Sequence, residues 1–375
     1  MTGRLVIVAH EVGAWVNHRA ATADTATAAG WKVTLLMGGE GDPVPLAAEG
    51  GPTYHSLPMA RGHSGAREIA ASLRVLRRML GDADVAELVT LKPIALGMLA
   101  WRTLPPSRRP RMVATFAGLG TVLDAALPRR RSWLVFALRA LLRGRAHILV
   151  ENPDDAQSLV GAGIVKLADV TVGPGVGLPA SWLALPPNRT DRTDRDRTRA
   201  LYVGRLIASK GVNDLVAAAR ILRERDVPVD VVLVGALDDR NPSAIAAAEV
   251  AGWQQDGLVL WRGHVTDILS EYRSCDVVVL ASHREGRPRS LMEAQALGIP
   301  VIATDVPGCR QAMLAGRTGL LVAPHDPAAL ADAIETLATD RSMRDRFGAA
   351  ARTYAREQFG DDHFLKVWKS VVLGS

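Results

Sequence analysis

The fold is decided by one stretch, VVVLASHREGRPRSLMEAQALGIPVIATDVPG (277–308). Apolar runs at Val277–Ser282 and Pro300–Thr304 flank a charged loop and a segment of helical period that begins near Ser290–Leu291. Continuous apolar runs are typical of strands that are covered on both faces, as in a parallel sheet. The stretch therefore predicts a strand–helix–strand unit with a right-handed crossover.

The same rhythm runs along most of the chain. Apolar runs alternate with Ala-, Leu- and Arg-rich segments, and the other candidate strands are Leu5–Ala9, Val33–Met37, Val85–Leu88, Met112–Phe116, Ile148–Val150, Ala200–Gly204, Val229–Gly235 and Leu258–Arg262. The rhythm is interrupted once, where Pro186-Pro187-Asn188 leads into the charged run RTDRTDRDRTR (189–199). A run with no apolar residue is typical of a solvated linker.

We therefore predict an α/β protein of two Rossmann-like domains that face a central cleft, where the ligands of such sheets bind. The expected parts are an N-terminal domain (1–184), a charged linker (185–199), a C-terminal domain (200–358) and a final segment (359–375). The final segment reads as an amphipathic helix with Phe364 and Trp368 on its apolar face. We expect this helix to return to the N-terminal domain.

The composition is that of a globular protein with an ample apolar core. Of the 375 residues, 48% are hydrophobic and 22% are charged. The two cysteines, Cys275 and Cys309, stand alone in their segments, so the sequence predicts neither a disulfide framework nor a zinc site. The first apolar run is too short for a signal peptide, and 18 uncharged apolar residues never occur together. We expect a cytoplasmic protein without a membrane-spanning helix.

Two glutamates mark the junction of loop and helix in the opening stretch. Glu285 lies in the loop and Glu293 lies one turn into the helix, eight residues further on. Such a junction directs backbone N–H groups and the positive end of a helix at an anion, and Gly286 lets the backbone approach a ligand closely. Carboxylates would repel phosphates, so we expect them to accept hydrogen bonds from paired hydroxyls instead. Glu293 suits a ribose diol, and Glu285 suits the hydroxyls of a transferred sugar.

In this setting, Glu285-x7-Glu293 resembles the donor-binding signature of the retaining glycosyltransferases of family 4, which have the GT-B fold. The segment LYVGRLIASKG (201–211) agrees, because in that family its basic residues contact the donor diphosphate, whose developing charge fixed cations stabilise. The resemblance covers nearly all of residues 200–325. It implies a catalytic set of Glu285, Arg205 and Lys210, and a donor-binding set of Glu293, Arg289, Ser290, Leu291, Gly286, Gly13, Gly204 and His264.

The first domain resembles one branch of that family, which elongates lipid-linked sugars for bacterial capsules, O-antigens and glycans. The resemblance rests on TLKPIALGMLAWR (90–102), TFAGLGTVL (115–123) and ENPDD (151–155). It implies an acceptor side formed by Lys92, Gly118, Gly120 and His18. Relatives in this branch have histidines before the Thr-x-Lys-Pro segment, where this chain has Glu87-Leu88-Val89. Either Glu87 takes part of that role, or the histidine is not essential in this subgroup.

The family resemblance implies retaining transfer of a hexose or N-acetylhexosamine from a UDP-sugar to a hydroxyl of a lipid-linked sugar. It implies no tightly bound cofactor and no essential metal, because basic groups and helix ends replace the cation. Front-face attack is favoured, since no well-placed nucleophile stands out. The alternatives are the same chemistry on a soluble small-molecule acceptor, a GT-B sugar-nucleotide epimerase, and a non-catalytic binding module.

The net charge of +6 is concentrated in the segment 128–145, PRRRSWLVFALRALLRGR. Its six arginines are interleaved with Trp133, Leu134, Ala137, Leu138, Leu141 and Leu142 at helical spacing. One interpretation is a buried crossover helix with solvated arginines. The other is an interfacial helix that holds the protein at the inner face of an anionic membrane, as a lipid-linked acceptor would require. Few aromatic residues lie between the basic ones, so nucleic-acid binding is not expected.

Overall fold

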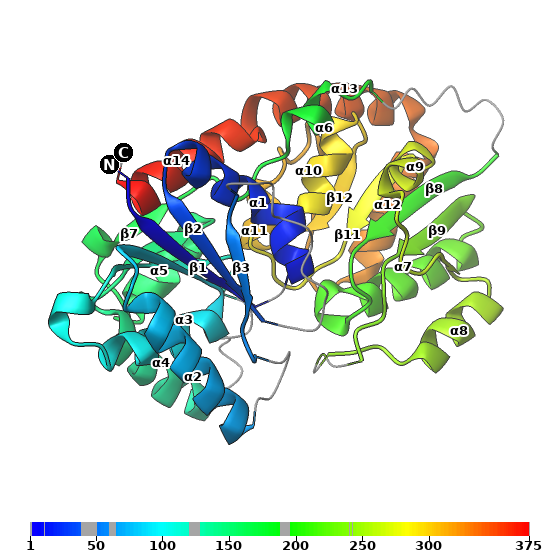
Figure 1. The fold of residues 1–375 in the computed structure, drawn as a ribbon. Helices are drawn as coiled ribbons and strands as arrows, with labels where there is room; N and C mark the ends of the chain where they lie inside the picture. The colour runs from blue at the N-terminus through cyan, green and yellow to red at the C-terminus, as the bar shows by residue number, and fades with distance from the viewer. Residues whose placement is uncertain are drawn as a thin grey trace. The chain divides into compact units, whose positions relative to one another are not determined.

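The computed structural model describes residues 2–10, 12–38, 51–59, 65–119, 128–187, 196–239, 241 and 243–374, apart from the side chains of 12–18 and 128–132. The chain divides into two compact units. Unit 1 contains Met1–Val176 and Asp362–Ser375, and unit 2 contains Gly177–Asp361. Each unit is built on a parallel sheet between helices, so the prediction of two Rossmann-like α/β domains is confirmed (Figure 1).

The described part of unit 1 holds a seven-stranded sheet in the order β3-β2-β1-β4-β5-β6-β7. Its strands are β1 (Arg4–Ala9), β2 (Lys32–Met37), β3 (Thr53–Ser56), β4 (Val85–Val89), β5 (Arg111–Phe116), β6 (His147–Val150) and β7 (Val170–Val172). Its helices are α1 (Val12–Ala28), α2 (Ala66–Leu80), α3 (Leu91–Arg102), α4 (Pro128–Leu142), α5 (Pro153–Gly161) and α14 (Asp361–Leu373), with short 3-10 turns at Pro106–Arg108 and Leu167–Asp169.

Successive residues of β1 are buried on opposite faces of this sheet, which explains its continuous apolar run. Val6 and Val8 join a core that includes residues of α2, α3 and α4. Leu5 and Ile7 join a second core on the other face, with residues of α1 and α14. The final helix, α14, therefore completes unit 1 (Figure 1). Its Trp368 is fully buried there.

The described part of unit 2 holds a six-stranded sheet in the order β10-β9-β8-β11-β12-β13. Its strands are β8 (Thr198–Val203), β9 (Val229–Val234), β10 (Leu260–Trp261), β11 (Val277–Leu280), β12 (Val301–Thr304) and β13 (Gly319–Val322). Its helices are α6 (Ala180–Ala184), α7 (Val212–Glu224), α8 (Ala247–Gln255), α9 (Ile268–Arg273), α10 (Arg289–Ala296), α11 (Pro307–Gln311), α12 (Pro327–Thr339) and α13 (Arg341–Gln358), with a 3-10 turn at Ala208–Lys210. Both sheets pair in parallel throughout their described strands.

The structure differs from the sequence prediction at the boundary between the units, which lies at Val176 and not at residue 184. The reason is a small apolar cluster in unit 2, in which Leu178 packs with Met292 and Phe359. The Leu178 N–H also donates to the Phe359 carbonyl at 2.6 Å. Part of the expected linker likewise belongs to a strand, because β8 begins at Thr198.

Candidate functional site

The candidate donor site lies where the strands of unit 2 end at their carboxyl edge. Two glycines hold the loops there in close contact. A Cβ on Gly211, whose φ is +69°, would lie 1.8 Å from the Ala281 carbonyl oxygen. A Cβ on Gly235 would lie 1.8 Å from the Gly204 carbonyl oxygen. The loop after β8 therefore packs directly against the ends of β9 and β11, in a way that only glycine permits.

Lys210 and Glu285 meet across this contact. Lys210 Nζ lies 2.5 Å from Glu285 Oε1, and the Ser282 hydroxyl donates to the same oxygen at 2.6 Å. The Glu285 side chain is 8% exposed and that of Lys210 is 25% exposed. The two residues belong to the predicted catalytic set but come from different sequence motifs, and the fold brings them together in an ion pair. A carboxylate oxygen offers more than one lone pair, so Glu285 retains acceptor capacity for a ligand hydroxyl.

Glu293 lies in α10, in a mostly buried position. Arg289 Nε donates to its Oε1 at 2.7 Å, and the Tyr272 hydroxyl donates to its Oε2 at 2.9 Å. Burial raises the pKa of Glu293, and the charge and hydrogen bond of Arg289 and the hydrogen bond of Tyr272 oppose that shift. Burial, followed by the charge of Glu293, raises the pKa of Tyr272. Tyr272 was not predicted, and no sequence signal connects it with α10.

Arg205 is oriented by an acid that the sequence did not indicate. Its Nη1 lies 2.7 Å from Asp238 Oδ2, and the Asp238 side chain is 7% exposed whereas that of Arg205 is 44% exposed. The Tyr202 hydroxyl donates to the Arg205 carbonyl at 2.7 Å. Burial raises the pKa of Tyr202, so this phenol stays neutral and acts as a donor. The guanidinium is therefore held at the surface by a buried partner, a suitable arrangement for a cation that meets an anionic ligand.

The remaining predicted donor residues come from several separate segments. Gly286 packs closely against the start of α11, since a Cβ on Gly308 would lie 2.2 Å from its carbonyl oxygen. Ser290 and Leu291 are in the first turn of α10, where Leu291 is fully buried, so its side chain belongs to the core. His264 is exposed and follows Gly263, whose φ is +70°. In unit 1, Gly13 is the second residue of α1.

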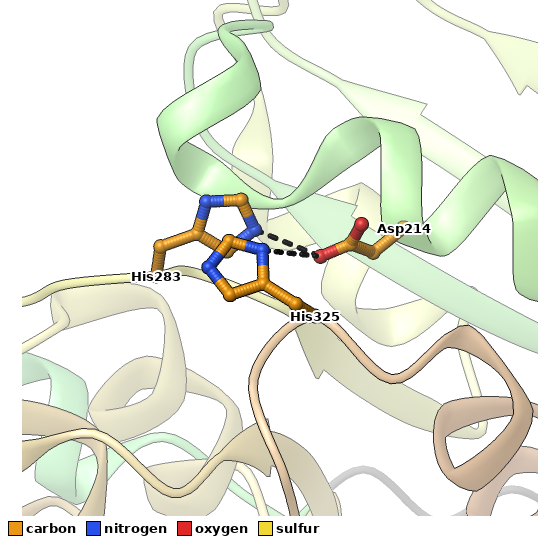
Figure 2. A group of neighbouring side chains, drawn as sticks. All are labelled: Asp214, His283 and His325. Carbon is orange, nitrogen blue, oxygen red and sulfur yellow. Dashed lines mark hydrogen bonds and ion pairs between the residues drawn. The ribbon is translucent and has the colours of Figure 1, made fainter.

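A further cluster lies beside the Lys210–Glu285 pair along the chain and was not predicted. His283 Nε2 lies 2.8 Å from Asp214 Oδ2, and His325 Nδ1 lies 4.0 Å from the same oxygen. The two imidazole rings lie 3.8 Å apart, centroid to centroid. Figure 2 shows both rings turned toward the one carboxylate. Among the described residues, these three form a group whose side chains could hold a metal ion.

On the acceptor side, the structure argues against the predicted role of Glu87. Its side chain is inside unit 1, with the residue 1% exposed. The Thr115 hydroxyl donates to Glu87 Oε1 at 2.7 Å, and Trp368 Nε1 donates to Oε2 at 2.9 Å. Because both oxygens serve a buried network and α14 covers them, Glu87 joins the last helix to the sheet and does not face a ligand.

Lys92 and Gly118 remain at the carboxyl edge of the first sheet. Lys92 is the second residue of α3, and burial lowers its pKa while the charge of Glu68 opposes the shift. Thr90, just before α3, has a positive φ of 73°. Gly118 has a φ of +82°, and the next residue, Leu119, donates its N–H to Asp155 Oδ2 at 3.2 Å.

The ENPDD segment (151–155) therefore has a structural role. Asp155 receives a bond from Asn152 Nδ2 at 2.9 Å, and the Asn152 side chain accepts from the Asp155 N–H at 2.7 Å. This arrangement caps the start of α5 and fixes the loop that contains Gly118. Gly120 and the side chain of His18 lie outside the described residues, so their predicted roles stay predictions.

Helix α4 buries a narrower face than its sequence predicts. Leu138, Leu141 and Leu142 are buried, but Trp133 is 63% exposed and Phe136 is 74% exposed. Of the two interpretations of this segment, a fully buried crossover helix does not account for Trp133 and Phe136, because α4 turns this part of its surface away from the sheet. Within the described part of the chain, no helix combines the length and the apolarity that a bilayer span requires.

The match to a family model lies within unit 2. Residues 189–354 match the family model described as "Glycosyl transferases group 1". The chain is 34% identical over 158 residues to the capsular polysaccharide biosynthesis glycosyltransferase CapM of Staphylococcus aureus, covering 42% of this chain and 41% of CapM. It is 35% identical over 243 residues to a D-inositol 3-phosphate glycosyltransferase of Paenarthrobacter aurescens, covering 62% of this chain and 58% of that protein. The chain thus spans about half the length of the curated relatives it matches.

Solved structures share the fold over nearly the whole chain. A sucrose-phosphate synthase from Thermosynechococcus elongatus superposes with a TM-score of 0.77 at 20% identity, covering 99% of this chain and 100% of that one. Anabaena HepE, solved in complex with UDP-glucose, superposes with a TM-score of 0.73 at 16% identity, covering 98% and 100%. At these identities the likeness is one of architecture, two Rossmann-like domains of the GT-B kind.

Proposed function

We propose that this chain, whose residues 189–354 match the model of the group 1 glycosyl transferases, transfers a hexose or N-acetylhexosamine from a UDP-sugar with retention at the anomeric carbon. The observation that carries the proposal is the convergence of Lys210, Ser282 and Glu285 at one carboxylate oxygen. A lysine beside a glutamate offers an ammonium group that can bind a diphosphate and a carboxylate that can accept hydrogen bonds from sugar hydroxyls. The binding of UDP and UDP-glucose by HepE, a structural neighbour, supports the choice of donor.

In the proposed reaction, the bond between the anomeric carbon and the diphosphate oxygen breaks, and a bond to the acceptor oxygen forms on the same face. The proton of the acceptor hydroxyl passes to the departing diphosphate oxygen. Arg205, Lys210 and the N–H groups at the start of α10 stabilise the charge that develops there. Glu285 accepts hydrogen bonds from the transferred sugar, and Glu293 accepts them from the ribose. We assign this chemistry to protein groups, without a required metal or tightly bound cofactor.

The donor assignment is tested by binding and turnover. UDP- and GDP-sugars are mixed with the protein, and thermal unfolding is followed. At least one UDP-sugar is expected to raise the melting temperature, since a ligand that binds only the folded state stabilises it. Glu285→Gln should lower kcat/KM for the donor by about 10²-fold, on the scale of a lost transition-state contact. The matched control is Glu357→Gln, an exposed carboxylate in α13. No shift with any nucleotide sugar, or equal turnover of the two variants, would sink the proposal.

For the acceptor, we propose a lipid-linked sugar at the inner face of an anionic membrane. The proposal is supported by the exposed rings of Trp133 and Phe136 in α4, which lie within the segment 128–145 and its six arginines. Aromatic and basic side chains together are the signature of helices that lie in a membrane interface. The name of CapM, a capsular polysaccharide enzyme, agrees with such an acceptor. In a liposome flotation assay, the chain should float with anionic vesicles, and the double variant Trp133→Ala/Phe136→Ala should not.

A second acceptor class is favoured by other relatives. Several are named D-inositol 3-phosphate glycosyltransferases, whose acceptor is a small phosphorylated polyol. If the wild-type chain stays with the soluble fraction in flotation and consumes its donor with a soluble polyol phosphate, this second candidate replaces the first. The location would then be the cytoplasm, without peripheral membrane attachment.

A further inference from the structure

We infer that Asp214, His283 and His325 form a binding site for a divalent transition-metal ion of the zinc class, separate from the carboxylates of the proposed donor site. Each residue offers one ligand atom, and these atoms all lie within 4.8 Å of one another. Two imidazole nitrogens and one carboxylate oxygen are a ligand set that zinc and its neighbours prefer, whereas magnesium and calcium prefer oxygen ligands alone.

The observed spacing is close to that of a metal-bound set. With bonds of about 2.0–2.1 Å and tetrahedral angles, neighbouring ligand atoms lie about 3.3 Å apart. Here the carboxylate oxygen of Asp214 lies 2.8 Å from His283 Nε2 and 4.0 Å from His325 Nδ1. The first distance must open and the second must close for an ion to bind, and the ligand nitrogens of the two histidines, which lie within 4.8 Å of each other, complete the set. Both rings already point at the same oxygen, from two different loops (Figure 2).

The backbone at His325 is an independent sign that this side chain is used. Its φ is +60°, in the left-handed region that glycine enters freely and other residues enter at an energetic cost. The side chain is also 67% exposed, so burial offsets little of that cost. Residues held in such conformations cluster at functional sites. The exposure also leaves one side of the site open for entry of an ion and for water as a fourth ligand.

An ion at this position would connect three segments at the carboxyl edge of unit 2. Asp214 lies in the first turn of α7, His283 follows β11, and His325 precedes α12. Asp214 comes four residues after Lys210, and His283 comes two residues before Glu285. The bound ion would therefore fix the two segments that supply the Lys210–Glu285 pair. The bound ion would order these segments and would take no part in the transfer step.

The test is a titration of the untagged full chain, stripped with a chelator and dialysed, with ZnCl₂ in a calorimeter. One ion per chain is expected. His325→Gly and Asp214→Asn should each weaken binding at least about ten-fold, since each removes a direct ligand and even loss of outer-shell partners weakens metal binding by about 10–100-fold. Glycine at 325 accepts the observed φ, so this variant should fold. The matched control is His363→Ala, which removes an exposed histidine of α14 in unit 1 and should bind zinc as the wild type does.

Two further readouts keep binding and folding apart. Zinc should raise the melting temperature of the wild type and of His363→Ala but not that of His325→Gly. Cobalt should give a visible absorption spectrum with the wild type that is lost in His325→Gly, while magnesium should give no saturable heat. If the wild type binds no stoichiometric zinc, or if His325→Gly and Asp214→Asn bind it as tightly as the wild type, the inference is overturned. The titration contains no sugar nucleotide, so failure of the proposed transfer reaction leaves its outcome unchanged.

Discussion

Replacement of Gly211 by alanine tests directly how the candidate site is built. Gly211 follows Lys210 and has a φ of +69°. A non-glycine residue in this left-handed region costs about 1–2 kcal/mol. The new Cβ would also lie 1.8 Å from the Ala281 carbonyl oxygen, whereas real Cβ contacts essentially never fall below 3.0 Å. The loop must therefore move by roughly 1 Å, and overpacking of this kind costs about 1–3 kcal/mol. Together, Gly211→Ala should destabilise unit 2 by about 2–5 kcal/mol.

Gly257→Ala is the matched control, because it shares the backbone term and lacks the steric one. Gly257 has a φ of +67°, and nothing lies within 4 Å of a Cβ placed there. It should lose only the conformational term, about 1–2 kcal/mol. The difference between the two variants is then about 1–3 kcal/mol, and each kcal/mol shifts the melting temperature of a domain of this size by about 2–4 °C.

The assay is differential scanning calorimetry of the two variants and the wild type. The units can unfold separately, so the transition of unit 2 must be resolved from that of unit 1 before the variants are compared. Gly211→Ala should also displace Lys210 from Glu285, and a misplacement of about 1 Å can lower turnover about 10²-fold. Gly257→Ala should keep wild-type turnover. Equal melting temperatures of the two variants would refute the steric argument, whatever the activity.

Three other predictions follow from buried groups. Because burial raises the pKa of Glu293, its contribution to stability is present below its ordinary pKa of 4.5 and lost as the pH rises through the raised value. The melting temperature of Glu293→Gln should therefore rise relative to that of the wild type as the pH increases from 4.5 toward neutrality. A difference in melting temperature that is independent of pH would contradict this. Trp368→Phe leaves a buried oxygen of Glu87 without its donor and should lower the free energy of unfolding in urea by about 1–3 kcal/mol. Trp133→Phe, at an exposed position, should change it by no more than about 0.5 kcal/mol. Similar losses in the two variants would argue against the buried hydrogen bonds of Glu87. Burial, with the charge of Glu285 as a second cause, raises the pKa of the Cys309 thiol. In the variant Cys275→Ala, a thiol reagent should therefore label Cys309 only after unfolding. Rapid labelling of the folded variant would contradict the burial of Cys309.

Interior strands could be predicted from the sequence, and most edge strands could not. Strands such as β1 and β11 are buried on both faces, so their residues form continuous apolar runs. The unpredicted strands, β3, β7 and β13, are all edge strands. In β3, the sequence TYHS is almost entirely exposed. An edge strand is held by its neighbour's backbone as much as by burial of its own side chains, and backbone pairing leaves little mark on the sequence.

The same limit applies to the site. Glu285, Glu293, Arg205 and Lys210 could be selected because each lies in a local motif with recognisable neighbours. Their partners could not, because Asp238 reaches Arg205 from the segment after β9 and Tyr272 reaches Glu293 from α9. Glu87 shows the converse error. Its place before the Thr-x-Lys-Pro segment suggested a ligand contact, but α14 arrives from 281 residues further along the chain and covers it.

The Asp214, His283 and His325 cluster shows how topology adds what local motifs lack. No spacing rule connects these residues, since Asp214 and His283 are 69 positions apart. Yet α7 and α12 pack against each other on one side of the sheet, and each begins at the carboxyl edge. Asp214 lies in the first turn of α7 and His325 lies directly before the cap of α12, so the packing of the two helices brings their starts together. β11 pairs with β8, the strand that precedes α7, and so delivers His283 to the same place. Given the strand order, polar residues at the starts of neighbouring helices become candidates for one site, and the zinc titration tests that reasoning here.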